Sequence, residues 1–231
     1  MVADIDLSKV TREGGKYWNE GVGWQPIGDG SAPFTGNIAG EGYALEGVFI
    51  NNSTANNVGI FGVIKDGTVK RLAILNPEIT GGTVVGSLAA LVVGGTIQEC
   101  YVFEGYVSGE FFVGGLIGVL QTSESLLENS YSYLKIRQKS DPIPSGGGLV
   151  GNNQSGIIRN VYSLSTVAGE PVNNGAILGS GNPSPVQSYF NTELAGPDNA
   201  KGAGLISAAM RQQASFENWD FADVWKIEED R

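Results

Sequence analysis

Few residues in this sequence have the types and spacing that catalysis needs. The chain contains no histidine, so Ser-His-Asp triads, histidine acid–base catalysis and histidine-ligated metal sites are excluded. Serine and threonine are plentiful, but no histidine or matched lysine marks any of them as a nucleophile. The single cysteine, Cys100, lies in an apolar segment, which favours a small core residue over a reactive thiol and excludes an internal disulfide.

Acidic residues could bind a cation, but they are scattered along the chain. Asp4, Asp6 and Asp29 could gather around Ca²⁺, although acids near a terminus more commonly face water. Two glycine-rich turns, at 28–30 and 40–42, lack the following helix and lysine of a phosphate-binding loop. We therefore predict no cofactor and no metal site, with calcium as the minor alternative.

One set of side chains is spaced for ligand binding by stacking. Tyr101, Tyr131, Tyr162 and Phe190 recur at intervals of 30, 31 and 28 residues. If these rings face inward, they form a ladder in the core, and this is the arrangement we expect. If they face outward, rings about 5 Å apart could stack against sugars or another protein surface. These four residues are the candidate ligand-binding residues of the chain.

The elements that would position these rings are internal repeats. A turn of small residues followed by an apolar pair returns five times, at intervals of 27, 28, 33 and 28 residues; its anchors are Gly59, Gly86, Gly114, Gly147 and Gly175. A second, apolar anchor follows ten to fourteen residues later in each unit and keeps the same period. Because two independent anchors share one period, we infer five repeats of about 28 residues.

The repeats predict strands and turns. Each unit holds short runs rich in Val, Ile, Leu and Tyr, broken by Gly, Asn, Ser and Asp, and no run keeps a 3.6-residue period. Each strand can stack on its equivalent in the next unit, about 4.8 Å away. The predicted fold is therefore all-β: a right-handed parallel β-helix, or β-solenoid, of about five 28-residue coils.

We predict a single domain, 1–231, with distinct ends. Residues 1–55 form irregular N-terminal coils with strand-like pieces at 2–7, 34–38 and 43–50, residues 56–196 form the repeats, and residues 197–231 form a cap. A short helix is expected over 207–214, with Ser207 as its N-cap. The aromatic residues that follow are interpreted as a lid over the last coil, with a ligand-binding cluster as the alternative. They are Phe216, Trp219, Phe221 and Trp225.

Equivalent positions in successive units do not collect the clustered carboxylates of a β-solenoid polysaccharide lyase or hydrolase. Mixed charges favour a solvated outer face over a paired-carboxylate site. One such column is Lys70, Gln98, Glu128, Arg159 and Gln187, and its neighbour is Arg71, Glu99, Asn129, Asn160 and Ser188. Asn129 and Asn160 are expected at a corner, where stacked amides could hydrogen-bond between coils.

Two of the repeats carry a recognisable motif. Gly147-Gly148-Leu149-Val150-Gly151 is followed by Gly156-Ile157-Ile158-Arg159-Asn160-Val161-Tyr162, and Gly114-Gly115-Leu116-Ile117-Gly118 is followed by Asn129-Ser130-Tyr131. The sequence resembles the GLUG-motif repeats of bacterial surface and secreted proteins. The flanking segments, with Trp24-Gln25-Pro26-Ile27-Gly28 before and Trp219-Asp220-Phe221 after, extend the resemblance to nearly the whole chain. The resemblance implies an adhesin-like protein and supplies no catalytic residues.

Composition and charge limit the classes of partner that the protein can bind and indicate where the protein is located. The formal net charge is −10 and the pI is near 4.5, so nucleic acid and acidic membranes are poor partners. The longest apolar run, at 81–95, is broken by glycine and too short to cross a bilayer, so no membrane insertion is expected. The first residues lack the features of an export signal, and we interpret the chain as a fragment of an exported protein, extracellular or at the bacterial cell surface.

These observations predict a function without catalysis. We expect a structural or adhesive repeat module that presents a binding face to a glycan or to a host or partner protein, and that is monomeric as an isolated fragment. The alternative is a carbohydrate-active enzyme of the lyase or hydrolase type, which a carboxylate cluster in a groove would support. Ice binding needs a flat threonine-rich row, but only Thr68 and Thr96 coincide between units.

Overall fold

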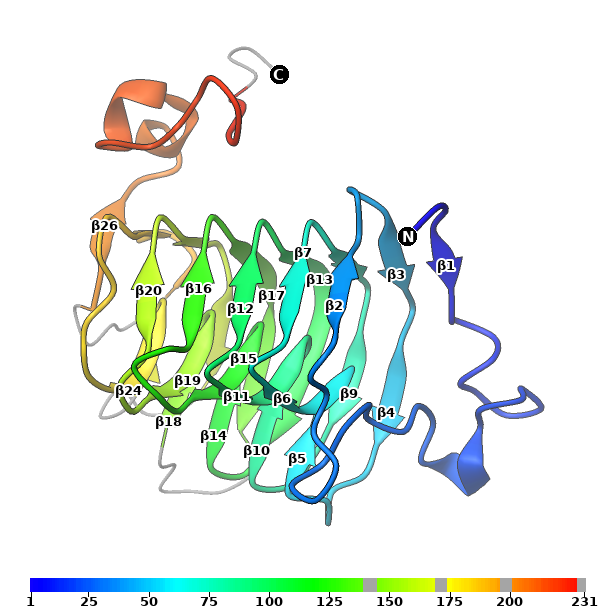
Figure 1. Cartoon of the computed structure of the whole chain (residues 1–231). Helices are drawn as coiled ribbons and strands as arrows, with labels where there is room; N and C mark the ends of the chain where they lie inside the picture. Colours follow the sequence, from blue (N-terminus) through cyan, green and yellow to red (C-terminus); the bar gives the residue numbers. More distant parts are fainter. Residues whose placement is uncertain (139–144, 169–173, 196–200, 228–231) are drawn as a thin grey trace.

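The computed structural model describes residues 1–138, 145–168, 174–195 and 201–227. These residues form a solenoid of about five turns, whose coils follow one another along one axis from the N-terminal end (Figure 1). Each full turn contributes strands to four sheets in which the strands pair in parallel. The predicted all-β solenoid is confirmed.

The largest sheet has eleven strands and is called the eleven-stranded sheet below. Its members are β1 (Ile5–Asp6), β3 (Ala44–Glu46), β4 (Phe49–Asn51), β8 (Ala73–Leu75), β9 (Glu78–Thr80), β13 (Tyr101–Gly109), β17 (Tyr131–Gln138), β21 (Tyr162–Ser163), β22 (Thr166–Ala168), β25 (Tyr189–Asn191) and β26 (Ala203–Leu205). It includes β13 and β17, which are long enough to span two shorter strands of the neighbouring coils.

The other three sheets have five strands each. One comprises β5 (Asn57–Val58), β10 (Val84–Gly86), β14 (Phe112–Gly114), β18 (Ser145–Gly147) and β23 (Asn174–Gly175). The next comprises β6 (Phe61–Lys65), β11 (Ala89–Val93), β15 (Ile117–Leu120), β19 (Val150–Asn153) and β24 (Leu178–Gly181). The last, at the front of Figure 1, comprises β2 (Asn37–Ala39), β7 (Thr68–Lys70), β12 (Thr96–Gln98), β16 (Leu126–Glu128) and β20 (Ile157–Arg159).

The repeated glycines mark a corner where consecutive coils approach too closely for a side chain. A Cβ on Gly147 would overlap the carbonyl oxygen of Val150 and lie 2.6 Å from the backbone nitrogen of Gly179 in the next coil. The equivalent Gly114 meets Ile117 and the next coil in the same way. The anchor of the sequence repeat is therefore glycine because backbone fills the space that a Cβ would take.

A second corner is built from residues in the left-handed backbone region. Their φ angles lie between 47° and 53°, which is strained for residues with a side chain and most easily tolerated by asparagine. This column is Arg71, Glu99, Asn129, Asn160 and Gln187. The predicted corner at Asn129 and Asn160 is confirmed. The expected amide ladder is not found among the described hydrogen bonds, where the Asn160 N–H instead donates to the Val186 carbonyl oxygen at 3.1 Å.

Aliphatic side chains fill the inside of the coils. Ile74 and Val102 from the eleven-stranded sheet belong to one core cluster with Val85 and Leu116, and all four side chains are fully buried. Cys100 is also fully buried, as predicted, and its burial raises the pKa of the thiol to about 12. A thiol that stays protonated in this way is a core residue and not a nucleophile.

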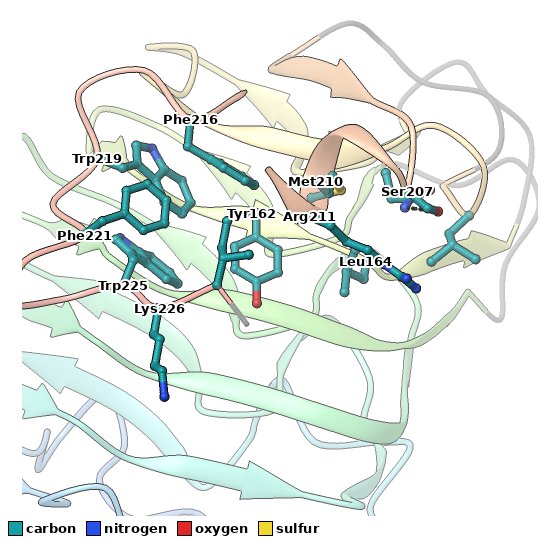
Figure 2. Close-up of a pocket in the computed structure, with 13 residues that line it drawn as sticks. Tyr162, Leu164, Ser207, Met210, Arg211, Phe216, Trp219, Phe221, Trp225 and Lys226 are labelled. Atoms are coloured by element: carbon teal, nitrogen blue, oxygen red, sulfur yellow. Dashed lines mark hydrogen bonds between the residues drawn. The ribbon is translucent and has the colours of Figure 1, made fainter. Parts of the chain in front are cut away.

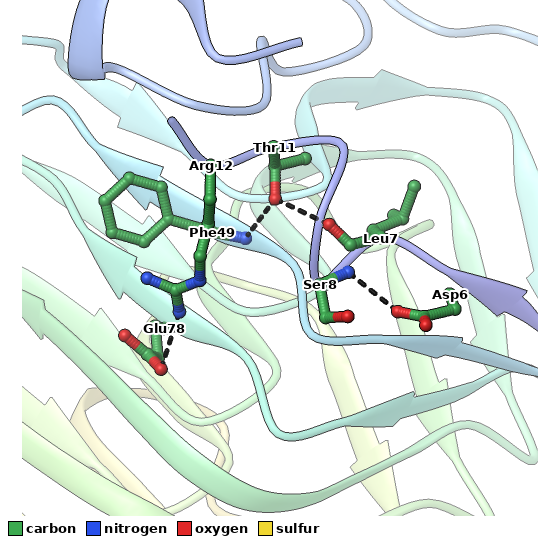
Figure 3. Close-up of polar contacts among 7 residues, drawn as sticks. All are labelled: Asp6, Leu7, Ser8, Thr11, Arg12, Phe49 and Glu78. Atoms are coloured by element: carbon green, nitrogen blue, oxygen red, sulfur yellow. Dashed lines mark hydrogen bonds and ion pairs between the residues drawn. The ribbon is translucent and has the colours of Figure 1, made fainter. Parts of the chain in front are cut away.

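The N-terminal segment is tied to the first coils by short strands and polar contacts. The three expected strand-like pieces correspond to β1, β2, β3 and β4, and the piece at 43–50 is divided into β3 and β4 by a turn at Gly47, which has positive φ. Figure 3 shows how the loop after β1 is fixed: the hydroxyl of Thr11 donates to the Leu7 carbonyl oxygen at 2.8 Å and accepts from the Phe49 N–H at 3.3 Å. The loop therefore adds a partial turn to the end of the solenoid.

The C-terminal segment differs from the expectation in two respects. The helix predicted over 207–214 is two short 3₁₀ turns, η3 (Ala209–Arg211) and η4 (Gln213–Ser215), besides η1 (Asn19–Gly21) near the N-terminus. Ser207 does not cap a helix, because its N–H donates to Glu193 and its hydroxyl accepts from Asn191.

Among the described residues, no helix has the length and apolar character needed to cross a membrane.

The aromatic lid lies on the outside of the solenoid. Phe216 and Trp219 pack against Tyr189 on the outer face of the eleven-stranded sheet and form a cluster separate from the main core. The end of that sheet is instead extended by β26, which pairs with β25. The aromatic residues therefore lie over the last two coils and cover their side, while β26 extends the end of the sheet.

Candidate ligand-binding face

Three of the predicted site residues form a stacked row on the outer face of the eleven-stranded sheet. Tyr101 pairs in register with Tyr131, and Tyr131 with Tyr162. Their ring centroids are 4.6 and 4.7 Å apart and the rings are within 5° of parallel. Neighbouring positions on the same strands, Val102 and Ser132, are fully buried, whereas the three tyrosines are half-buried. Because side chains alternate along a strand, the rings point outward. The expected inward ladder is wrong for these three residues.

Phe190 does not belong to this row. Tyr189 is the residue in register with Tyr162, and Phe190 is in register with Ser163, on the inner side. Phe190 accordingly packs in the main core and is buried. The aromatic column assigned from the sequence slipped by one residue in this unit, because Val186 pairs with Arg159 rather than with Ile158. A one-residue slip moves a side chain to the opposite face of the strand.

The far end of the tyrosine row is covered by the C-terminal segment. Trp219 and Trp225 contact Tyr162 at 6.1 and 5.6 Å between ring centroids, and the two indoles stack on each other at 4.4 Å (Figure 2). The Trp219 indole N–H donates to the Gln187 carbonyl oxygen at 2.9 Å, and the Tyr189 hydroxyl accepts from the Glu217 N–H at 2.9 Å. A cavity of about 300 Å³ remains between this segment, Tyr162 and Leu164. The segment also reaches the Tyr101 end of the row, where Val224 and Trp225 line a second hollow of about 340 Å³ together with Tyr101 and Tyr131.

Burial raises the pKa of all three stacked tyrosines. Desolvation is the main cause in each case, because a phenolate loses more hydration than a phenol when it is covered. The neighbouring phenolates of the row add charge repulsion at Tyr131 and Tyr162, and the Asp4 carboxylate does so at Tyr101. The hydroxyl groups of the three tyrosines therefore stay protonated and neutral at neutral pH.

Alkaline pH is expected to destabilise the protein through this row. An unfolded tyrosine ionises near pH 10, while these three resist ionisation in the folded state. Their contribution to stability is therefore complete below about pH 10 and is lost as the pH rises above that value. Chemical denaturation from pH 8 to 11 measures this loss. The double variant Tyr131→Phe, Tyr162→Phe should flatten the loss, and an unchanged pH profile in that variant would contradict the assignment.

A second row of outward side chains runs along β17, the strand that carries Tyr131, and leads to a groove. On β17, the residues Tyr133, Lys135 and Arg137 are exposed and alternate with the buried Leu134 and Ile136. The Tyr133 ring lies 5.1 Å from the ring of Phe103, its in-register neighbour on β13. Both residues remain exposed, Tyr133 at 38% and Phe103 at 39% of full residue exposure.

The groove beside these rings has a volume of about 540 Å³. Its lining includes Glu78, Glu104, Tyr106, Tyr133, Lys135 and Arg137. A β-bulge forms one wall, because Glu104 and Gly105 both have positive φ and together oppose the single residue Leu134. Leu164 and Leu194 line both this groove and the cavity under the C-terminal segment, so the two are neighbours.

The charges in the groove are unevenly paired. Glu78 forms an ion pair with Arg12 at 2.6 Å, and the same guanidinium lies over the Phe49 ring, as Figure 3 shows for the three side chains. The Arg137 guanidinium lies 5.0 Å from the centre of the Tyr106 ring. Within the described part of the chain, neither Lys135 nor Arg137 takes part in an ion pair. The groove therefore offers two cations beside exposed aromatic rings.

The acidic residues considered for calcium do not come together. The Asp6 carboxylate accepts from the Ser8 N–H (Figure 3), and the Asp29 carboxylate accepts from Ser31 and Ala32. These hydrogen bonds lower the pKa of both carboxyl groups, and they are the bonds of ordinary turns. Asp4 accepts from the Ala44 N–H on the outer face. In the described ranges, no cluster of three metal-ligating side chains is present.

The second row could have been predicted from the sequence. The segment from Tyr131 to Arg137 alternates aromatic or cationic residues with smaller or apolar ones, which is the pattern of a strand with one buried face. The row does not recur at equivalent positions of the next unit, where Thr166 and Ala168 pair with Lys135 and Arg137, so only the alternation along this one strand indicates it. The bulge at Glu104 and Gly105, which opens the groove, has no comparable signal beyond its single glycine.

Comparisons with known proteins give two relatives in sequence. No family model matches the chain. It is 35% identical to Halomucin of Haloquadratum walsbyi over 134 aligned residues, and this alignment covers 56% of this chain and 1% of Halomucin. It is 42% identical over 81 residues to a "putative Gly-rich membrane protein" of Evansella cellulosilytica, which covers 35% of this chain and 9% of that protein. The matches thus span small parts of relatives whose names are those of surface or membrane-associated proteins.

A solved structure has the same fold. The crystal structure of a "putative immunoglobulin A1 protease" from Bacteroides ovatus superposes with a TM-score of 0.57 over 95% of this chain and 80% of that chain, at 16% sequence identity. At this identity the likeness concerns the fold alone. The chain is therefore a β-solenoid similar in sequence to segments of much longer surface or membrane-associated proteins.

Proposed function

We propose that this chain is a non-catalytic adhesive module of a cell-surface or secreted protein and that its eleven-stranded sheet binds a glycan. The observation that carries the proposal is the pair of exposed rings, Phe103 and Tyr133, beside a groove lined by polar and charged side chains. Aromatic rings cover the apolar faces of sugars, and charged or amide groups bond to their hydroxyls. The names of the two relatives support an extracellular or surface location.

Membership of the GLUG-motif repeats is part of the same proposal. The turn at 147–151 places Gly147, Gly148 and Gly151 where backbone atoms of neighbouring coils leave no room for a Cβ. This gives a physical reason for a motif of three glycines around an apolar pair. The motif then serves the scaffold, and the binding residues are supplied by the outward positions of other strands.

An enzymatic role would need an acid and a base in the same groove. Glu78 and Glu104 both line it, but the ion pair with Arg12 engages Glu78. Glu104 is then the lining carboxylate outside the described ion pairs, and one carboxylate does not supply both the acid and the base of a glycosidase. We therefore favour binding over turnover, with a carbohydrate-active enzyme as the second candidate.

A glycan-binding measurement tests the proposal. The protein should bind at least one polysaccharide on an array, and the double variant Phe103→Ala, Tyr133→Ala should lose at least about tenfold in affinity, or about 1.4 kcal/mol. Because both rings are exposed, the melting temperature should change little, since surface sites cost within about 0.5 kcal/mol each.

The control is Phe111→Ala, which removes another exposed ring; unlike Tyr133 it does not line the groove, and unlike Phe103 it does not pack on Tyr133. Its glycan binding should equal that of the parent protein. Loss of binding in the control, or binding that survives in the double variant, would contradict the placement of the site. Release of new reducing ends from a bound polysaccharide would favour the enzymatic alternative.

A further inference from the structure

We infer that the groove beside β17 selects acidic polysaccharides, in which sugar rings carry carboxylate groups. This inference rests on the proposed function and adds the chemical class of the ligand. The geometry points to it because one strand presents, in order, the outward side chains of Tyr131, Tyr133, Lys135 and Arg137. Rings and cations thus follow each other along one strand, at about 6.6 Å for every second residue.

The two cationic side chains of the groove, Lys135 and Arg137, can bind an anion. The protein carries a net charge of −10, and its three described ion pairs use Arg12, Arg71 and Arg159. Lys135 and Arg137 take part in none of these pairs, and both side chains are exposed. The Arg137 guanidinium is held over the Tyr106 ring at 5.0 Å, which limits its conformations while leaving its N–H groups for a ligand.

The balance of charge within the groove favours single carboxylates over a dense polyanion. Arg12 neutralises Glu78, so Lys135 and Arg137 face one further acid, Glu104 at the bulge. An excess of one positive charge suits a polymer with one carboxylate per sugar. Nucleic acid, with a phosphate about every 3.4 Å of each strand, would meet the acidic remainder of the protein and be repelled.

The aromatic rings explain why the ligand is a sugar acid rather than a small anion. Phe103 and Tyr133 are exposed side by side and provide apolar area that a free carboxylate or phosphate cannot use. A uronate residue has both parts: an apolar ring face for the aromatic pair and a carboxylate that a guanidinium can bind with two parallel hydrogen bonds.

Polygalacturonate and its methyl ester provide the direct test, because they share one backbone and differ in the carboxylate charge. Isothermal titration of the full chain should give at least tenfold tighter binding to polygalacturonate than to the ester, and added salt should reduce the difference. Equal affinity for the two polymers would overturn the inference while leaving the proposed function intact. Binding to neither polymer would overturn the inference, and the failure of every glycan on the array would also overturn the proposed function.

Variants with matched charge locate the site. Lys135→Gln with Arg137→Gln removes two positive charges and should reduce polygalacturonate binding to the level of the ester. Lys65→Gln with Lys70→Gln removes the same two charges from exposed positions on other sheets and should leave binding within about twofold. Glu104→Gln should strengthen binding to polygalacturonate but not to the ester. An equal loss in both lysine-containing double variants, or no effect of Glu104→Gln, would show that the net charge of the protein and not the groove governs binding.

Discussion

Replacing Gly147 with alanine is expected to lower the stability of the solenoid by about 3 kcal/mol. The new Cβ would overlap the Val150 carbonyl oxygen and lie 2.6 Å from the backbone nitrogen of Gly179. These atoms cannot move aside like the end of a side chain, because β18 is held between β14 and β23 by parallel pairing on both sides. For a chain of this length the melting temperature should fall by roughly 6–12 °C, measured by circular dichroism or calorimetry.

The matched control is Gly30→Ala. A Cβ at Gly30 meets no atom within 4 Å, and Gly30 does not require positive φ. The same chemical change should therefore leave the melting temperature within about 2 °C, because a surface substitution costs no more than about 0.5 kcal/mol. If both variants melt alike, the close approach of the coils at the repeat glycine does not limit the stability of the fold.

The scaffold could be predicted from the sequence because its cause is periodic. Close approach at the corner demands glycine at Gly59, Gly86, Gly114 and Gly147, and the core demands apolar residues beside them, so the same physical constraint recurs from coil to coil. Any single unit can be degenerate and the period still holds. Ala89 and Ala176, where other units carry larger residues or glycine, are simply buried small side chains.

The orientation of the tyrosine row could not be predicted in the same way. A corner at Asn129 and Asn160 resets the alternation, so the sequence does not say which side of the strand a residue one or two positions later will face. Ser132 and Ser163, which take the inner positions, are polar and give no sign of burial by themselves. Their burial is satisfied by hydrogen bonds, including one from the Ser132 hydroxyl to the Gly148 carbonyl oxygen at 2.7 Å.

The C-terminal segment lies where it does because of contacts far apart in the sequence. A helix over 207–214 was expected from local propensity, but Glu193 and Asn191 engage the backbone and hydroxyl of Ser207. The aromatic residues of the segment pack against Tyr162 and Tyr189, which lie about thirty to sixty residues earlier in the chain. Propensity is a weak guide where such tertiary contacts decide the structure.

This separate packing leads to the prediction that Trp219→Ala releases the C-terminal segment and leaves the solenoid folded. Trp219 is buried, contacts Tyr162, Tyr189 and Phe216, and its indole N–H donates to the Gln187 carbonyl oxygen. Loss of a buried tryptophan costs about 3–5 kcal/mol. Because the cluster around Trp219 is separate from the main core, the cost should appear as local opening of the segment and not as global unfolding.

Limited trypsin digestion measures that opening. Arg211 lies in η3, within the segment, so cleavage after Arg211 should become about 10² to 5 × 10³ times faster in Trp219→Ala, as long as cleavage follows the open population. Trp18→Ala is the control, since Trp18 stacks on Phe49 at the N-terminal end and its loss should not change cleavage after Arg211. The strand signal in circular dichroism should persist in both variants. If Trp219→Ala instead unfolds the whole chain, the segment is an integral part of the solenoid, and the covered end of the tyrosine row cannot be exposed without losing the fold.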